Sequence, residues 1–415
     1  MFNKIMKYKK ELLIFIFIVV AIYFIHHYIS TDFVMNTPVI HSNELINNKQ
    51  VTPQQLYDES WVVIKKCYID SSFNHQDWKK WEKRYKGKIK NDADAQVAID
   101  TMLASLDDPY SRFLPQKEYK EQYNSIDSHI TGIGVNIMSK NGNVIIFSVI
   151  KDTPAYFAGL RNNDIILKVD NKNVSGMDIS DVASLVRGPI ESKVTLKIKR
   201  KNKIIYKTIT RKKIEIKSIE SSVKKNNIGY IKIKSFIGSN TASDFVTELK
   251  KLEKTKGLII DLRGNTGGLL TNAIIVANMF MNKGTIVSIV SKNGDKHDIS
   301  AQSNVSVINK PTVVLVDGAS ASASEILSGA LKDNKKAVIV GSKTFGKGLV
   351  QQIVPLPNQT GINITIAKYL TPAGFDINKK GIEPDVVVPY TFANMKSHND
   401  TQLKKAEYII DTMCK

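Results

Sequence analysis

Three alternating serines, Ser320, Ser322 and Ser324, follow an apolar run typical of a buried strand and precede a helical pattern. A hydroxyl on such a turn lies beside backbone N–H groups. The helix N-terminus adds partial positive charge where an oxyanion can form. Serines at this place also cap helices, so the run alone is a weak indication of a nucleophile.

A serine nucleophile needs a base, and the usual base is histidine. After residue 130 the chain holds only His297 and His398, and both lie in polar runs without motif character. Their distance along the sequence does not exclude a Ser-His-Asp triad. A lysine can act instead when burial lowers its pKa toward neutrality. Lys347 has a glycine on each side and apolar neighbours, although a lysine in a turn is usually a solvated charge.

These residues need a scaffold, and the pattern from about residue 226 onward is typical of an α/β domain, because strands alternate with helices of about ten residues. We expect strands over 228–233, 257–262, 313–316 and 337–340, and helices over 243–253, 270–281 and 324–331.

Between residues 129 and 199 the pattern is different: short strands are separated by Gly and Asn turns, with one short helix over 179–186. A glycine-containing loop that enters a strand beside a helix can accept an extended peptide as an added strand. Its N–H groups can hold the terminal carboxylate of that peptide.

The N-terminus carries four lysines before Leu12–Ile25, a run of 14 apolar residues. This pattern predicts a membrane anchor over residues 1–30, with a cleaved signal peptide as the alternative. Lysines before the span place the N-terminus in the cytoplasm, so the rest of the chain is expected outside it. Residues 31–49 are expected to form a tether and residues 50–118 a helical region, with helices over 56–68 and 94–106. Residues 391–415 are expected to be a tail with a closing helix over 402–413.

Composition excludes several classes of protein. The 415 residues are 42% apolar, which provides for a packed core and excludes a disordered chain. The net charge is +20, but it is diffuse and lysine-rich, and aromatic residues are not interleaved with it. We therefore expect no nucleic-acid partner. The two cysteines, Cys67 and Cys414, are expected to be free thiols and cannot form a zinc site.

Three motifs together resemble the carboxyl-terminal processing peptidase family, the tail-specific or S41 proteases. They are LRGNTGG (262–268), ASASASEILSGAL (319–331) and GSKTFGKGLVQ (341–351), in that order. Three further blocks are similar to the family: YLTPAGFDINKKGIEPD (369–385), FNHQDWKKWEKRY and MLASLDDPYSRFL. The block TGIGVNI…VIKDTPAYFAGLRNNDIILKVDNKNVSG resembles a PDZ domain. This resemblance implies that Gly132, Ile133, Gly134 and Val135 form its carboxylate-binding loop.

The resemblance implies roles for individual residues. Ser322 would be the nucleophile, Lys347 its neutral base, and Gln351 a hydrogen-bond partner that orients the lysine. The N–H of Ala323 and one N–H from Gly267 or Gly268 would form the oxyanion hole. Glu325 and Asp333 also match family positions and are interpreted as structural.

The fold implied is a multidomain α/β (α+β) chain: the N-terminal helical region, a PDZ domain over 119–203 and a crotonase-like ββα protease core over 204–390. The function implied is a membrane-anchored serine endopeptidase outside the cytoplasm, which cleaves near the C-termini of exported proteins. The PDZ domain would bind the C-terminus of a protein or peptide substrate.

Two other functions stay open. One is a catalytically idle PDZ scaffold that recruits a partner protease. The weaker one is a crotonase-like acyl-transfer enzyme, for which the sequence offers no acyl-CoA site. No metal or organic cofactor is expected, and a homo-oligomer is compatible with the N-terminal helices.

Overall fold

The computed structural model describes residues 50–120, 129–140, 142–177, 179–215, 218–303, 308–389 and 399–415. The expected N-terminal anchor and tether lie outside these residues. Among the helices that the structure describes, none has the length and apolar character needed to cross a membrane. The chain divides into two compact units, one made of residues 124–217 and the other of residues 1–123 together with 218–415.

The larger unit is built on a six-stranded sheet with the order β10-β11-β12-β15-β16-β19. Only β10 is antiparallel to its neighbour; the other pairs are parallel. The strands are β10 (Ile219–Lys224), β11 (Ile228–Ile233), β12 (Gly257–Asp261), β15 (Thr312–Val316), β16 (Val338–Gly341) and β19 (Val386–Val387). β12 and β15 are buried along their whole length, which explains why their sequences are continuous apolar runs rather than alternating ones.

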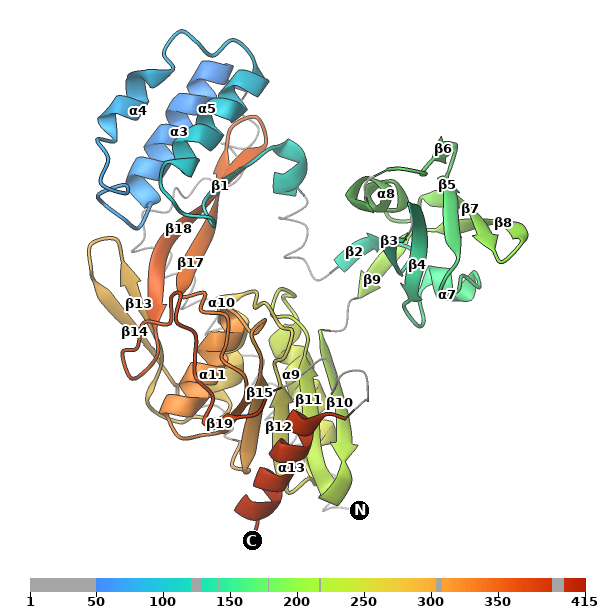
Figure 1. Cartoon of the computed structure of the whole chain (residues 1–415), viewed down its shortest axis with the longest axis vertical. Coiled ribbons are helices and arrows are strands. Elements are labelled where there is room, and N and C mark those ends of the chain that lie inside the picture. The colour runs from blue at the N-terminus through green and yellow to red at the C-terminus, as the bar shows by residue number, and fades with distance from the viewer. Residues whose placement is uncertain are drawn as a thin grey trace, which may run out of the picture. The chain divides into compact units, whose positions relative to one another are not determined.

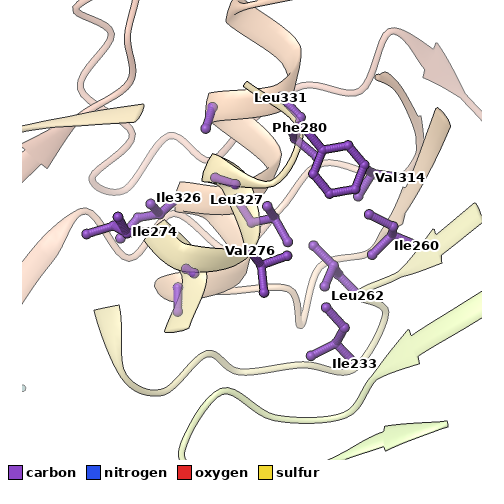
Figure 2. Close-up of a cluster of buried hydrophobic side chains, with 14 of the residues drawn as sticks. Ile233, Ile260, Leu262, Ile274, Val276, Phe280, Val314, Ile326, Leu327 and Leu331 are labelled. Atoms are coloured by element: carbon purple, nitrogen blue, oxygen red, sulfur yellow. The ribbon is translucent and has the colours of Figure 1, made fainter. Parts of the chain in front are cut away.

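Helices cover both faces of this sheet (Figure 1). One face packs against α9 (Thr241–Lys251), α10 (Leu270–Asn278) and α11 (Ala323–Asp333). Figure 2 shows the side chains of this core, in which Val276, Leu327 and Leu262 point toward one another. The other face packs against α13 (Thr401–Met413) through Ala406 and Ile410. Because α11 is held on the sheet along its length, its N-terminus has a fixed place at the carboxyl end of β15.

A second sheet in this unit has the order β1-β18-β13-β14, with β17 paired to β18. Its strands are β1 (Arg112–Leu114), β13 (Thr285–Ser291), β14 (Lys296–Ser300), β17 (Leu349–Leu356) and β18 (Thr360–Leu370). The N-terminal helices α3 (Pro53–Cys67), α4 (Lys79–Arg84) and α5 (Asp92–Ala104) pack with β17 and β18 in one apolar cluster. The side chains of Thr52 and Asn91 cap α3 and α5. Both cysteines are free, Cys67 buried in α3 and Cys414 exposed.

The smaller unit has a five-strand path β3-β4-β5-β7-β8, with β6 paired to β5 and a separate β2-β9 pair. Its strands are β2 (His129–Gly132), β3 (Val135–Lys140), β4 (Asn143–Val149), β5 (Ile165–Val169), β6 (Lys172–Asn173), β7 (Lys193–Arg200), β8 (Lys203–Thr210) and β9 (Lys212–Glu215). Two short helices, α7 (Pro154–Phe157) and α8 (Ile179–Val186), complete it. β3 ends the path, so one of its edges carries no strand of the described chain.

The multidomain mixed fold class predicted from the sequence is confirmed. The boundaries of β11 and α8 agree with the predicted ranges, and the closing helix is α13. α10 ends at Asn278, three residues before the predicted end, because Met279 to Met281 turn away in hydrogen-bonded turns.

Candidate active site

The turn between β15 and α11 holds Ser322 in a strained conformation, with φ 56° and ψ −116°. Such a backbone is rare for a residue with a side chain, and it persists only when the surroundings enforce it. Three bonds enforce it here. The Ser320 hydroxyl donates to the Leu262 carbonyl (2.9 Å) and the Ala321 N–H to the Asn265 carbonyl (3.1 Å). The Ser322 N–H donates to Oε2 of Glu325 (2.8 Å).

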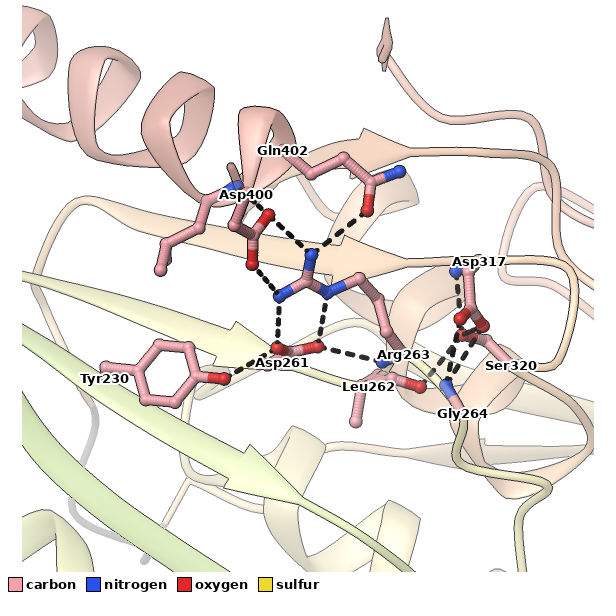
Figure 3. A network of polar contacts seen from close by, with 10 residues as sticks. Tyr230, Asp261, Leu262, Arg263, Gly264, Asp317, Ser320, Asp400 and Gln402 are labelled. Carbon is pink, nitrogen blue, oxygen red and sulfur yellow. Dashed lines mark hydrogen bonds and ion pairs between the residues drawn. The ribbon is translucent and has the colours of Figure 1, made fainter. Parts of the chain in front are cut away.

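An ion-pair network anchors the loop that faces this turn (Figure 3). The Arg263 guanidinium bonds to the Asp261 carboxylate at the end of β12 and to Asp400, which caps α13. Asp261 is buried and also accepts a hydrogen bond from the Tyr230 hydroxyl (2.6 Å). The two acidic partners raise the pKa of Arg263, although its burial acts in the opposite direction. The network therefore fixes the start of the glycine loop at residues 264–268.

The glycines of this loop lie against the serine turn. Gly267 has φ 101°, and a Cβ at that position would lie 2.8 Å from Cβ of Ser322 and 3.0 Å from the Ala323 N. Gly268 has φ 143°, and a Cβ there would clash with the backbone of Phe236. The Gly267 N–H donates to Oδ1 of Asn265 (2.9 Å), whereas no hydrogen bond from the Gly268 N–H is found within the described residues. Glycine is therefore required at both positions, and Gly268 has the unused donor.

Glu325 joins the serine turn to the lysine loop. Its fully buried carboxylate accepts hydrogen bonds through Oε2 from the N–H groups of Ser322 (2.8 Å) and Lys347 (2.9 Å). Through Oε1 it accepts from the Gly346 N–H (2.7 Å) and the Thr344 hydroxyl (2.6 Å). One carboxylate thus holds the backbones of residues that are 25 positions apart in sequence. Glu325 thus contacts the backbones of both candidate residues, a more direct position than the sequence indicated.

Lys347 is half-buried, and its Nζ lies 4.8 Å from the centre of the Tyr110 ring. Burial lowers the pKa of this lysine, while the nearby Asp108 carboxylate acts in the opposite direction. The net direction favours the neutral amine that a general base requires.

Tyr369, in β18, is a site residue that the sequence did not single out. Its buried hydroxyl donates to the Lys347 carbonyl. Burial raises the pKa of this phenol, so it stays protonated and remains a donor. Tyr369, like Glu325, therefore fixes the backbone of Lys347.

The remaining candidates are placed as follows. The Gln351 side-chain amide donates to the Thr365 hydroxyl (3.3 Å), which in turn donates to Asp108 (2.7 Å). His297 is exposed on the edge strand β14, and His398 lies outside the described residues. The Asp333 carboxylate accepts a hydrogen bond from the Ala373 N–H (2.9 Å).

The smaller unit contains a groove of about 270 Å³ beside the open edge of β3. The predicted loop lines one end of it, and α8 contributes Ile179, Ala183 and Val186. Gly134 has φ 87°, and a Cβ there would lie 2.3 Å from the Thr153 hydroxyl, so this turn needs glycine.

A strained serine at a helix N-terminus has the surroundings of a nucleophile in acyl transfer. An open-edged groove in a β-domain can accept an extended peptide. Together they define a candidate serine peptidase. Comparison with known proteins agrees with this class. Residues 227–388 match the model of peptidase family S41, and residues 145–200 match that of the PDZ domain.

Several curated proteins are similar over most of the chain. The carboxyl-terminal-processing protease of Synechocystis sp. is 36% identical over 369 residues, which cover 85% of this chain and 86% of that one. The chloroplastic C-terminal processing peptidase of Tetradesmus obliquus is 36% identical, with 81% and 77% covered. A solved structure of the photosystem II D1 C-terminal processing protease superimposes with a TM-score of 0.57 at 34% identity, over 82% and 94% of the two chains.

The chain belongs to peptidase family S41. It is a serine peptidase of the carboxyl-terminal-processing type and carries a PDZ domain.

Proposed function

We propose that this peptidase cleaves near the C-termini of exported proteins by a Ser322/Lys347 dyad, with its PDZ groove holding the tail of the substrate. The observation that carries the dyad is the shared oxygen of Glu325, which accepts the N–H groups of both residues at 2.8 and 2.9 Å. It supports the pairing because it holds the two backbones side by side on one buried group.

The mechanism begins when the Ser322 hydroxyl attacks the scissile carbonyl and its proton passes to the neutral Nζ of Lys347. Nζ must contact the hydroxyl in the substrate complex, and catalytic hydrogen bonds commonly tighten only when substrate is bound. The oxyanion that forms would accept the N–H groups of Ala323 and Gly268. We favour Gly268 over Gly267 because the Gly267 N–H already donates to Asn265.

Collapse of the tetrahedral intermediate breaks the C–N bond, and the lysine returns its proton to the leaving amine. Water then attacks the Ser322 ester, again with Lys347 as the base, and releases the new C-terminus. The buried Tyr369 hydroxyl, bonded to the Lys347 carbonyl, would keep the lysine loop in place through both steps.

The PDZ groove would bind the substrate tail as an additional strand on the open edge of β3, with its carboxylate at residues 132–135. Main-chain pairing provides affinity in this mode, and alternate side chains of the peptide enter the pocket. The apolar side chains from α8 favour apolar tail residues. Anchoring through Leu12–Ile25, with the peptidase outside the cytoplasm, is proposed from the sequence alone.

The test uses the full chain in detergent and a peptide with an apolar, free C-terminus. Ser322→Ala and Lys347→Ala are each expected to lower kcat/KM by at least about 10⁴-fold, because the two residues act as one unit. Both variants should still bind the tail peptide. Retained cleavage in either variant would contradict the dyad. Tail binding without turnover in the wild type would favour the idle scaffold.

A further inference from the structure

The segment between α5 and β1, residues 105–111, belongs to the N-terminal helical region but is attached firmly to β18. β1 continues the segment and pairs with β18, so that Arg112 lies opposite Asn363. The Asn363 side chain donates to the Tyr110 carbonyl (3.1 Å), and the Thr365 N–H donates to the Ser111 hydroxyl (3.0 Å). β18 is the partner of β17, which begins two residues after Lys347. The segment is therefore fixed on β18 by strand pairing and side-chain hydrogen bonds, and its Tyr110 ring lies 4.8 Å from Nζ of Lys347.

Within this segment the Asp108 carboxylate is fixed by three donors. They are the Tyr110 N–H (3.0 Å), the Ser111 hydroxyl (2.6 Å) and the Thr365 hydroxyl (2.7 Å). The charge of Asp108 opposes the effect of burial on Lys347, and the Tyr110 ring lies 4.8 Å from Nζ. A carboxylate and an aromatic face both favour a protonated amine.

We propose that Asp108 and Tyr110 are positioning residues for Lys347. The Tyr110 ring lies against its Nζ and Asp108 fixes the segment that carries the ring, so that together they set the pH range in which the lysine acts as the base. This inference rests on the proposed dyad. It also gives Gln351 an indirect role, because its amide bonds to Thr365, and Thr365 bonds to Asp108. Gln351 would then orient the carboxylate that acts on the lysine.

The groups that face Lys347 come from three elements. Asp108 and Tyr110 lie on the α5–β1 segment, Glu325 on α11 and the Tyr369 phenol on β18. Glu325 accepts the Lys347 N–H and is saturated by four donors, and Tyr369 donates to its carbonyl. Asp108 is the acidic group whose charge raises the pKa of the lysine, so it is the residue whose neutralisation should move that pKa.

The test measures kcat/KM against pH for the full chain and for Asp108→Asn. Removing the negative charge lowers the pKa of Lys347, so the amine becomes neutral at lower pH and the acidic limb of the profile moves to lower pH. Loss of the fixed partner should also lower the maximum by about 10- to 100-fold, because small misplacements of reacting groups are costly. Asp107→Asn is the matched control. Asp107 is exposed and its φ of 53° suits asparagine, so its profile should match the wild type.

A second variant, Tyr110→Leu, removes the aromatic face beside Nζ, which favours the protonated amine, and keeps the backbone N–H that donates to Asp108. It should move the acidic limb in the same direction by less, which keeps the inference testable if Asp108→Asn folds poorly. Unchanged acidic limbs in both variants, or an Asp107→Asn shift equal to that of Asp108→Asn, would overturn the inference. Neither result would touch the dyad, which fails only if Ser322→Ala or Lys347→Ala remains active.

Discussion

The site around Ser322 and Lys347 in the larger unit and the groove of the PDZ domain are built from different kinds of contact. Around Ser322 a few buried polar groups, above all Glu325, are saturated with hydrogen bonds of fixed direction. The groove instead uses the open edge of β3 and apolar side chains such as Ile179 and Val186. The loss of one atom should therefore have a large effect in the first region. In the second, a change should act in proportion to the area or shape it alters.

The largest effect expected from this comparison is on stability, in Arg263→Met. The substitution removes the counter-charge of Asp261, which is fully buried, and breaks the bonds to Asp400 at the start of α13. Breaking a buried pair by removing one partner costs about 3–5 kcal/mol. Urea unfolding of the full chain measures the change.

Lys343→Met is the matched control for Arg263→Met. It also removes a basic partner of an acidic residue, Glu383, but both side chains of that pair are more than half exposed. Such a pair is worth about 0–1 kcal/mol. Equal losses in the two variants would mean that burial of the network does not matter.

The next effect is on catalysis, in Glu325→Gln. The side chain keeps its size, but one oxygen becomes an NH₂ group that faces two donors. The Ser322 and Lys347 backbones, or Gly346 and Thr344, then lose their acceptor. We expect kcat/KM to fall about 100-fold, the cost of displacing reacting groups by about 1 Å. Peptide cleavage assays measure this.

Two observations make the Glu325→Gln result interpretable. Tail-peptide binding by the PDZ domain should be unchanged in this variant. Glu383→Gln, the same substitution on the exposed side chain of a neighbouring loop, should leave activity at the wild-type level. Wild-type activity in Glu325→Gln would show that other contacts are enough to place the pair.

Much of this arrangement could be predicted from the sequence because it is local. The apolar runs of β12 and β15 and the helical pattern of α11 each lie within one continuous stretch. Small residues between strand and helix also indicate a turn with a hydroxyl and nearby N–H groups, whatever the rest of the fold.

The partners of Lys347 could not be predicted, because they come from distant segments. Asp108 and Thr365 are 257 residues apart and meet only because β1 pairs with β18. Tyr369 begins a block similar to the family, but nothing in that block indicates a partner for its side chain. Only the pairing of β17 with β18 places its hydroxyl on the lysine loop. Long-range strand pairing of this kind leaves no pattern in the sequence on either side.

The smallest of the expected effects belongs to the groove. Ala183, on α8, lines it, and Ala183→Trp would fill space that the side chains of an added strand need. We expect KM for a substrate with an apolar tail to rise about tenfold, equal to about 1.4 kcal/mol, because the pairing edge of β3 remains and only side-chain space is lost. kcat should stay unchanged.

Asn202→Trp is the control for this prediction. It adds the same side chain in the exposed turn between β7 and β8, away from the groove, and should leave both kcat and KM unaltered. If Ala183→Trp lowered kcat and left KM unaltered, the groove would act on the catalytic step rather than on binding of the tail. The proposed separation of binding in the groove from catalysis at Ser322 would then be wrong.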